Sequence, residues 1–520
     1  MKSFLARFGA LVAFVLSGFD RLRFCGESRL LNHAGGVNSY LYQRGMLRKE
    51  FPDHCEKLTR WLRRQAKAQA ARENIPVKHL HSPLVEKDVL ALQLAQQHGR
   101  TQGRIALLTC QERGWTYRLR QTDDGFVEVR KESVPCNHHY HYFLHERFGL
   151  CYVRIQTWFP FAVRVGLNGR LWLARQLEQR GVPFQRQRNL ITATGDPLLA
   201  QQLLDEQTHA DWPTLLQELV KPIHPLWSFL HEEVHTPYYW MTEQSEWATD
   251  FVFQDPADLA RWYPCWIRQG LETLQCQDVL RYLGMKSPKH CTGEVKIDLR
   301  TRPEGARLKF WYDSNSLKLY NKEGVQEVPI ALRLENTVNK VSIFKVFRVK
   351  EGQDASAPKS WQQMRKGVAD LGRRADIGQA INNRFADTLA TVADTEPLGK
   401  LLEPLGRPVF HNGQRLARAL NPLTGADGDL LRVLANGTFL LNGFRNRDLR
   451  LALHGEAPDP AQRRRQAAAI TRLLAIVRAH GLIVKVQKSH RYHLSAAGKR
   501  IVTALLAAHA AKVDRLTAAG

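Results

Sequence analysis

A histidine-rich run in the second quarter of the chain has the residue types of a metal site or an acid–base site. The run is CNHHYHYFLH, residues 136–145. If residues 140–144 form a strand, its period of two places His139 and His141 on one face. Two imidazoles on one face can bind one divalent ion. The run therefore predicts a catalytic and metal-binding role for His139 and His141, with Mg²⁺ or Mn²⁺ as the candidate cofactor.

The triplet His139-Tyr140-His141 is similar to the His-hydrophobic-His core of HUH nickases. The resemblance implies that the two histidines and a further polar ligand hold a metal against the scissile phosphate while a tyrosine attacks it. A helix bearing that tyrosine should follow, but the next expected helix, NGRLWLARQLEQRG, contains none. The alternative is that these histidines pack in the core, or contact phosphate, without a metal.

A second block combines lysines, a tyrosine and a carboxylate on two expected strands, NSLKLYNK and LRLENTVN. Alternation along the first strand puts Lys318, Tyr320 and Lys322 on one face. The same period puts Arg333 and Glu335 on one face of the second strand. Phosphate binding by the lysines and a structural, metal-binding or catalytic role for Glu335 are both physically open.

This block resembles the KxYxK…RxE segment of some plasmid and phage replication initiators. In those proteins a strand with basic and aromatic residues pairs with a strand that carries Arg-x-Glu. The resemblance implies nucleic-acid contacts at Lys318 and Lys322 and a catalytic role for Glu335. The alternative is an exposed sheet face with an ordinary Arg–Glu cross-strand pair.

Carboxylates elsewhere in the chain could complete a two-metal phosphodiesterase site, which needs several convergent acids. The candidates are Glu246, Asp250, Asp298, Asp313 and Glu335. In a basic protein, most acids are surface partners of lysine and arginine, which is the alternative for this set.

A formal HExxH motif runs from His231 to His235. Thr236-Pro237 follows at once and should end any helix there, because a residue before proline avoids the helical conformation. We therefore expect no zinc-peptidase site in this segment.

The last part of the chain has the element order of a small helical domain with a hairpin. Apolar residues at helical spacing occupy residues 429–440, and a turn and cap precede the short helix LRLAL. Pro458-Asp459-Pro460 then opens a long helix that runs to about His480. LIVKVQKSHRYHLS alternates around a turn, which is typical of a two-stranded hairpin, and a final apolar helix follows.

This order resembles the winged-helix domains of MarR-type regulators, over about a fifth of the chain. In that family the second helix of the helix-turn-helix enters the major groove, and the wing contacts phosphate or the minor groove. The resemblance implies nucleic-acid contacts by basic residues of the long helix and the wing. They are Arg463, Arg464, Arg465, Arg472, Lys485, Lys488, His490 and Arg491. The alternative is a protein-interaction module whose arginine run is a solvated helix face.

The charge of this part favours a nucleic-acid partner. From Lys400 to Gly520 there are 20 Lys and Arg against 7 Asp and Glu, a net of +13 and about half of the chain's +25. Such an excess attracts a polyanion at long range and makes binding salt-dependent. We expect DNA as the partner, with RNA as the alternative.

The composition describes a globular chain, since 44% of the 520 residues are hydrophobic. The eight cysteines have no CxxC pair and no regular spacing, so neither a disulfide framework nor a zinc ribbon is predicted, and a reducing cytoplasm fits. The N-terminal run FGALVAFVLSGF is too short to span a bilayer, and we expect an amphipathic packing helix there and no membrane association.

We expect an α+β multidomain chain with a mixed helix and strand body, a helical connector and a C-terminal winged helix-turn-helix. All twelve tryptophans lie at or before Trp361 and all eight cysteines at or before Cys291, which places a boundary near residues 350–400. The predicted segments are a mainly helical region, 1–105; an α+β body, 106–350; a connector, 351–399, helical from Trp361; and a nucleic-acid-binding domain, 400–520.

The whole chain also looks like a group of long basic bacterial proteins with a MarR-like tail, through segments such as FDRLRF, RIQTWFPF and QSEWATD. The function expected is that of a cytoplasmic DNA-binding protein associated with a mobile element or its control. The alternatives are a metal-dependent nickase, nuclease or replication-initiator-like enzyme, and an RNA-binding subunit of a ribonucleoprotein.

Overall fold

The fold combines helices and strands along the whole described chain. A computed structural model describes residues 1–274, 276–285, 295–324, 326–350, 352–354, 356–391, 398–436, 439–440, 443–486 and 489–510. Helices contain 44% of the residues and strands contain 32%, so the architecture is mixed α/β. The prediction that helices and strands are mixed is thus confirmed.

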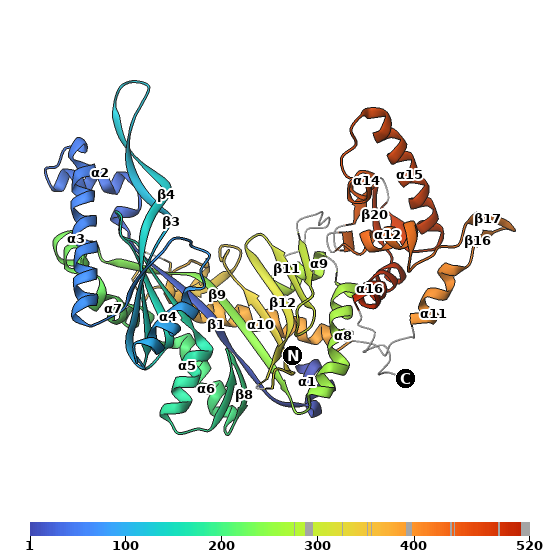
Figure 1. Cartoon of the computed structure of the whole chain (residues 1–520), viewed down its shortest axis with the longest axis horizontal. Helices are drawn as coiled ribbons and strands as arrows, with labels where there is room; N and C mark the ends of the chain where they lie inside the picture. Colours follow the sequence, from blue (N-terminus) through green and yellow to red (C-terminus); the bar gives the residue numbers. More distant parts are fainter. Residues whose placement is uncertain are drawn as a thin grey trace. The chain divides into compact units, whose positions relative to one another are not determined.

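The largest element is a mixed sheet of 11 strands (Figure 1). In spatial order these are β10 (Lys296–Arg300), β11 (Arg307–Tyr312), β12 (Asn315–Glu323), β13 (Pro329–Thr337), β9 (Tyr238–Phe253), β1 (Val12–Ser28), β6 (Val163–Asn168), β5 (Gly149–Gln156), β4 (Val127–His145), β3 (Gly103–Gln121) and β2 (Val77–Leu80).

The chain divides into two compact units, each assembled from segments that are distant in sequence. The terminal unit comprises Met1–Val15, Thr249–Asn336 and Ala380–Gly520. The inserted unit comprises Leu16–Ala248 and Thr337–Gln379. The four domains expected along the sequence remain a prediction.

Antiparallel hairpins build the strands of the inserted unit. β3 and β4 pair along their length, from Gly103 opposite Leu144 to Gln121 opposite Val127, and β5 and β6 continue the meander. β6 also pairs with β1, while β2 joins β3 as a parallel strand. The apolar run at residues 105–108 of β3 is fully buried, as expected for a strand covered on both faces.

Six helices of the inserted unit cover these strands or their ends. They are α2 (Ala34–Gln43), α3 (Phe51–Arg72), α4 (Lys87–Gln97), α5 (Gly169–Gln179), α6 (Pro197–His209) and α7 (Trp212–Val220). The side chains of Asn168, Asp196 and Asp211 cap α5, α6 and α7 by accepting hydrogen bonds from first-turn amides. The short strands β7 (Phe184–Gln187) and β8 (Leu190–Thr194) form a separate hairpin.

Aromatic side chains fill the core of the inserted unit. The Trp212 ring lies 4.7 Å from Phe24 and 5.5 Å from Trp172, between ring centroids. Phe148 packs against Trp172 at 5.4 Å. The tryptophans of the body thus serve mainly as core residues, since large aromatic side chains contribute most to burial.

The terminal unit begins with α1 (Lys2–Phe8) and also contains α8 (Pro256–Thr273) and α9 (Cys276–Tyr282). Phe4 and Phe8 of α1 lie 5.4 Å and 5.1 Å from Trp266 of α8, between ring centroids. The prediction of a helix over the whole N-terminal apolar run is wrong, because β1 begins at Val12. Valine and phenylalanine favour strands, and pairing in the sheet decides the conformation of this run.

The connector region contains less helix than the sequence predicts. Residues Lys345–Arg348 form β14, and Ser360–Gln363 form β15, so Trp361 lies on a strand. The helix α10 begins only at Leu371 and ends at Leu389. Trp361 and its neighbours instead pair with β14 in a two-stranded sheet.

The C-terminal part of the terminal unit contains five helices and two small sheets among its described residues. The helices are α11 (Leu398–Leu402), α12 (Gly425–Leu434), α14 (Asn446–His454), α15 (Pro460–Ala479) and α16 (Ala496–Ala510). β16 (Val409–His411) and β17 (Gln414–Ala417) form a hairpin. β18 (Phe444–Arg445), β20 (Arg491–Leu494) and β19 (Ile483–Lys485) form a three-stranded sheet with β20 in the middle.

Two glycines fix the path of the chain after α15. Gly481 follows the helix with a φ of +73°, a conformation that residues with a Cβ rarely adopt. Gly498, near the start of α16, lies so close to β19 that an added Cβ would be 2.0 Å from the carbonyl oxygen of Leu482. α16 therefore packs directly on the backbone that leads into β19.

Six cysteines are free thiols, namely Cys25, Cys55, Cys110, Cys136, Cys151 and Cys265. Cys276 is disulfide-bonded, which the irregular cysteine spacing does not predict. Every helix within the described residues is too short or too polar to span a bilayer.

Candidate functional site

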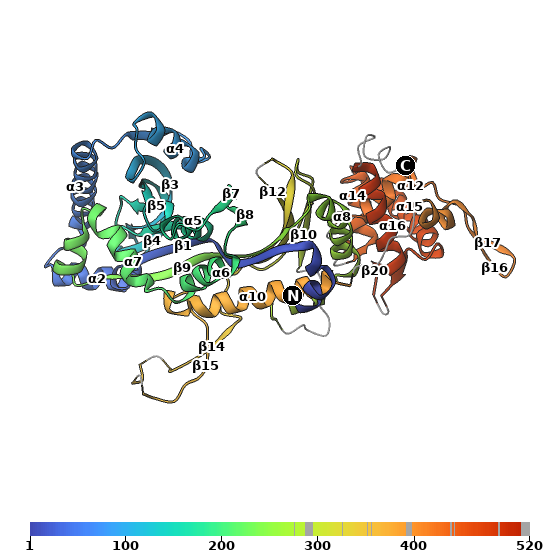
Figure 2. The same ribbon diagram turned by 90° about the horizontal axis from the view of Figure 1, so that it is seen from below.

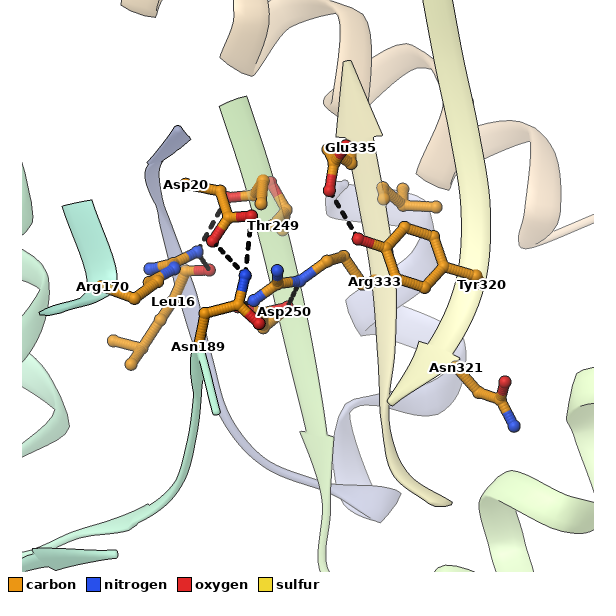
Figure 3. Close-up of polar contacts among 12 residues, drawn as sticks. Leu16, Asp20, Arg170, Asn189, Thr249, Asp250, Tyr320, Asn321, Arg333 and Glu335 are labelled. Atoms are coloured by element: carbon orange, nitrogen blue, oxygen red, sulfur yellow. Dashed lines mark hydrogen bonds and ion pairs between the residues drawn. The ribbon is translucent and has the colours of Figure 1, made fainter. Parts of the chain in front are cut away.

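Glu335 is the centre of a polar cluster on two neighbouring strands of the terminal unit. Its carboxylate accepts a hydrogen bond from the Tyr320 phenol (Figure 3) and forms an ion pair with the Lys318 ammonium. The Glu335 side chain is only 3% exposed and that of Lys318 is 17% exposed. Lys318 and Tyr320 both reach Glu335 from β12, which confirms that they share a face.

Cations lie near Tyr320 and Lys318. The Arg302 guanidinium carbon lies 5.2 Å from the centroid of the Tyr320 ring. Lys309 is directly opposite Lys318 across β11 and β12. Burial, followed by the charges of Lys318 and Arg307, lowers the pKa of Lys309. The cluster thus places a proton-accepting carboxylate beside a phenol, in surroundings that favour an anion such as phosphate.

Lys322 follows on the same strand and is half-buried. The period of two places it on the face of Lys318 and Tyr320. A phosphate role for Lys318 and Lys322 stays a prediction. Lys318 would need to exchange its contact with Glu335 for a ligand.

A second ion pair lies on the neighbouring strands β13 and β9. The Arg333 guanidinium donates to both carboxylate oxygens of Asp250, with 2.8 Å from Nη2 to Oδ2 (Figure 3). Arg333 is 0% exposed and Asp250 is 2% exposed. A bidentate buried pair holds its two strands in one register, because a slipped register would bury both charges without partners. Asp250 is therefore a structural partner of Arg333 rather than a free metal ligand.

Asn382 of α10 connects the helix to the same strands of the terminal unit. Its amide nitrogen donates to the Thr249 hydroxyl at 3.1 Å and to the Leu334 carbonyl at 3.0 Å. Its carbonyl oxygen accepts a hydrogen bond from the Asn336 amide at 2.9 Å. Asn382 is fully buried, so this network anchors the backbone on each side of Glu335.

Two of the other predicted acids, Asp298 and Glu246, are engaged with cationic or amide partners. Asp298 forms ion pairs with Arg300 at 2.6 Å and with Arg307 at 3.8 Å. In the inserted unit, Glu246 accepts a hydrogen bond from Gln244 at 2.9 Å. Asp313 occupies the turn after β11, with a φ of +55°.

His139 and His141 lie in the interior of the inserted unit. Together with His138 they are at most 1% exposed. The His139 and His141 ring centroids are 6.3 Å apart, and Arg104 Nη1 lies 3.3 Å from His141 Nδ1. Burial, followed by nearby cations, lowers the pKa of His138 and of His139 to about 3, so these rings are neutral at physiological pH.

Neutral imidazoles can bind a metal, and the His139 Nδ1 and His141 Nε2 atoms have no hydrogen-bond partner within the described part of the chain. A site needs a third ligand, however. Within the described residues, no group of three His, Cys, Asp or Glu ligand atoms within 4.8 Å of one another includes either histidine. A catalytic or metal-binding role for His139 and His141 remains a prediction, and core packing accounts for their burial.

The HExxH segment does not form a continuous helix. A helical turn covers Phe229–Glu233 and stops before His235, whose φ is +50°. His231 stacks on Trp227, with ring centroids 3.8 Å apart. The break before Thr236-Pro237 agrees with the expectation that proline ends the helix.

The arginines predicted for α15 line its exposed surface. Arg463, Arg464, Arg465 and Arg472 are all exposed, and none of them has a carboxylate partner among the described residues. Arg465 and Arg472 are seven residues apart, so they lie on the same side of the helix. Asp459 caps α15 by accepting a hydrogen bond from the Gln462 amide at 2.7 Å.

Polar contacts hold α14 against α15. The Asn446 amide donates to the Ala467 carbonyl and to the Thr471 hydroxyl, both at 2.9 Å. Arg450 is buried and contacts the Gln466 side chain at 3.3 Å. Two helices joined by a short turn are thus fixed at one angle, and Arg465 and Arg472 lie on the side of α15 that faces away from these contacts.

The basic residues of the hairpin after α15 differ in exposure. Lys485 and His490 are exposed, whereas Arg491 is half-buried and lies 3.5 Å from the Gly443 carbonyl. Lys488 lies outside the described residues. Lys499 of α16 is buried, and burial, opposed by the charge of Asp278 on α9, lowers its pKa, so it is not a surface cation.

The sequence did not single out Asn382 or the pairing of Asp250 with Arg333. The doublet Asn382-Asn383 interrupts the apolar face of a helix, which is a signal that a buried amide is present. The partner of Arg333 could not be found, because the two strands are about eighty residues apart in the chain.

No protein-family model, curated protein or solved structure matches this chain.

Proposed function

We propose that the protein binds nucleic acid, with DNA as its main partner, and that residues 400–520 contain a winged-helix module. The order α12, β18, α14, α15, β19, β20 and α16 supports this proposal, as does the sheet order β18-β20-β19. In a winged helix a short strand pairs with the hairpin that follows the second helix of the helix-turn-helix. That arrangement leaves α15 as the recognition helix and the β19–β20 hairpin as the wing.

The observation that carries the proposal is the set of four exposed arginines on α15. Among the described residues these arginines have no carboxylate partner, so their positive charges favour the binding of an anion. Arg465 and Arg472 would lie in or beside the major groove, and Lys485 and His490 would contact phosphates beside it. Arg491 is held by the Gly443 carbonyl and would orient the wing.

An electrophoretic shift of a labelled duplex tests this assignment. The double variant Arg465→Ala/Arg472→Ala should lose duplex binding by about ten-fold or more, since each specific or phosphate contact contributes on the order of 1 kcal/mol or more. Arg407→Ala is the matched control, because Arg407 is exposed but paired with Glu403. Duplex binding that is unchanged in the double variant would remove α15 as the contact.

The choice between DNA and RNA has its own test. Nucleic acid that co-purifies with the full chain can be treated with DNase or RNase. Sensitivity to DNase alone agrees with the proposal, whereas sensitivity to RNase alone would favour an RNA-binding subunit of a ribonucleoprotein. Association with a mobile element or its control rests on the resemblance to replication initiators alone.

The Glu335 cluster favours a second candidate function, a nickase or replication-initiator-like enzyme. Tyr320 already donates its phenolic proton toward Glu335, and Lys318 and Arg302 are nearby. In a strand transfer, Tyr320 Oη would form a bond to phosphorus while Glu335 takes its proton, and the bond to the leaving sugar oxygen would break. A positive site would stabilise the added charge on the phosphate.

Strand cleavage of labelled single-stranded and duplex DNA with Mg²⁺ or Mn²⁺ tests this candidate. Tyr320→Phe should abolish cleavage and the covalent DNA adduct, while Tyr282→Phe should not, because the Tyr282 phenol is hydrogen-bonded to the Thr388 hydroxyl and lies outside the Glu335 cluster. Loss of cleavage in His139→Ala or His141→Ala would support the metal role predicted for them. If the wild-type protein cleaves no DNA with either ion, the proposed nickase activity is wrong.

A further inference from the structure

The β14–β15 hairpin is a small two-stranded sheet in the inserted unit. Lys345 pairs with Gln363, Phe347 with Trp361, and Arg348 with Ser360, in antiparallel register. The hydrogen bond from the Met364 amide to the Phe344 carbonyl, at 2.9 Å, closes its base. Figure 2 shows the hairpin as a ribbon that stands out from the neighbouring elements of its unit.

Two large aromatic side chains lie unburied on one face of this ribbon. Phe347 is 54% exposed and Trp361 is 58% exposed. They are direct cross-strand neighbours, with ring centroids 5.5 Å apart. Phe344 and Met364 at the base of the hairpin are buried, so the apolar residues needed to hold the ribbon are separate from this pair. Paired exposed aromatics on a ribbon are a surface for a ligand rather than a core.

Cations flank the two rings on the same face. The period of two places Lys345 and Lys359 on the face of Phe347 and Trp361, one at each end of the pair, and both lysines are exposed. Arg373 donates from Nε to the Lys345 carbonyl at 3.1 Å and lies 5.8 Å from the Trp361 ring centroid. On the opposite face of the hairpin, Arg348 forms an ion pair with Asp370 at 3.9 Å, which attaches that face to the rest of the unit.

The whole segment has a net positive charge. From Lys340 to Arg373 there are eight Lys and Arg against three Asp and Glu. The surface therefore combines two stacking platforms with a positive field, and it offers little negative charge to a basic partner.

We propose that the face formed by Lys345, Phe347, Lys359 and Trp361 binds single-stranded nucleic acid. Successive bases stack on Trp361 and Phe347, and the phosphates between and beside them contact Lys345 and Lys359. Stacking on aromatic side chains along a positive surface is the general chemistry of single-strand binding. A duplex fits less well, because its base faces are already stacked on one another.

This assignment goes beyond the duplex contact proposed for α15 and does not depend on it. The two contacts use different residues and different forms of nucleic acid. A protein that holds both forms can act where a duplex is open, which a duplex-binding helix alone cannot do.

Fluorescence anisotropy with labelled dT12 tests the proposal on the full chain. Trp361→Ala and Phe347→Ala should each weaken dT12 binding by about ten-fold, the effect of losing one stacked base. Trp115→Ala is the matched control, because Trp115 is also 58% exposed but lies on β3, away from this hairpin in the chain. Circular dichroism spectra of the variants should match the wild type, since neither side chain is in the core.

Two further oligomers separate stacking from charge. An abasic 12-mer keeps the phosphates but has no bases, so it should bind weakly and equally to wild type and Trp361→Ala. Lys359→Glu should weaken dT12 and the abasic oligomer alike. Comparison of dT12 with rU12 then tells DNA from RNA as the source of the strand.

Unchanged dT12 affinity in both aromatic variants, or no dT12 binding by the wild type, would overturn the proposal. So would an equal loss in Trp115→Ala, which would indicate a general effect of tryptophan removal. Failure here leaves the α15 proposal intact, because duplex binding by Arg465→Ala/Arg472→Ala is measured with a different probe.

Discussion

Arg333 and Asp250 form a bidentate ion pair in a fully buried position, across the neighbouring strands β13 and β9. The cost of removing two charges from water offsets much of their attraction, so such a pair contributes more to strand alignment than to net stability. Glu335 is two residues beyond Arg333 on the same strand. The position of the candidate site therefore depends on this pair.

Removing one partner of the ion pair should lower the stability of the protein strongly. Asp250→Ala removes the bidentate carboxylate partner of the buried Arg333 guanidinium, and we expect it to lower the free energy of unfolding by about 3–5 kcal/mol. Asp298→Ala, which breaks a pair with the exposed Arg300, should cost less than about 1 kcal/mol. Urea denaturation of both variants measures the difference, and equal losses would contradict the structural role of the pair.

A substitution in the Asn382 hydrogen-bond network should also lower the stability of the protein. Asn382→Ala removes the hydrogen bonds that Asn382 makes with the Asn336 amide, the Leu334 carbonyl and the Thr249 hydroxyl, and we expect a loss of about 1–3 kcal/mol of stability. Asp376→Ala on the exposed side of α10 should be nearly neutral. Thermal unfolding of the two variants is the measurement. A melting temperature that is as low in Asp376→Ala would show that the loss is not specific to the Asn382 hydrogen bonds.

The buried histidines predict how stability depends on pH. Burial lowers the pKa of His138 and His139 to about 3, from an ordinary value of about 6.5 in the unfolded chain. Between these values the unfolded state binds more protons, so stability is fully present above the unfolded value and is lost as pH falls toward 3. Each histidine adds up to about 1.4 kcal/mol per pH unit to this slope.

Urea denaturation at several pH values between 5 and 8 measures that slope. His139→Leu should flatten it below pH 6.5 by removing one of the titrating groups. His490→Gln, which removes a histidine at an exposed position, is the control. If stability falls with pH in His139→Leu as steeply as in the wild type, then His139 does not take up a proton on unfolding in this pH range.

The close approach at Gly498 predicts a steric effect on the C-terminal part. Gly498→Ala would bring a methyl group to 2.0 Å from the Leu482 carbonyl and force α16 away from β19. We expect a loss of about 1–3 kcal/mol of stability, in the range of other overpacked sites. Gly399→Ala is the control, since an added Cβ there meets nothing within 4 Å. Equal melting temperatures for the two variants would show that α16 can shift freely.

The periodicity of the sequence predicts helices and strands best where the residues of one segment decide its conformation without distant partners. The helix from Pro460 and the hairpin after Gly481 have strong start and stop signals, and both are present. The shared face of Lys318 and Tyr320 followed from strand alternation alone. By contrast, the N-terminal apolar run is equally compatible with a helix and a strand, and pairing with distant strands decides between them.

The candidate site could be predicted only in part, because its partners come from distant segments. Lys318 and Glu335 were both named from residue type and spacing. Their contact, and the neutralisation of Asp250 by Arg333, depend on which strands become neighbours in the sheet. Trp361 was assigned to a helix because its neighbours have no clear alternation, and the exposed Phe347–Trp361 face was therefore missed.

We propose that the exposed arginines of α15 bind DNA. The most direct measurement is the affinity of the full chain for a labelled duplex as a function of salt concentration, for wild type and for Arg465→Ala/Arg472→Ala. We predict that the logarithm of affinity falls steeply with the logarithm of salt, and that the slope is shallower in the double variant by about 0.9 for each lost phosphate contact. An identical slope and affinity in the two proteins would contradict the claim.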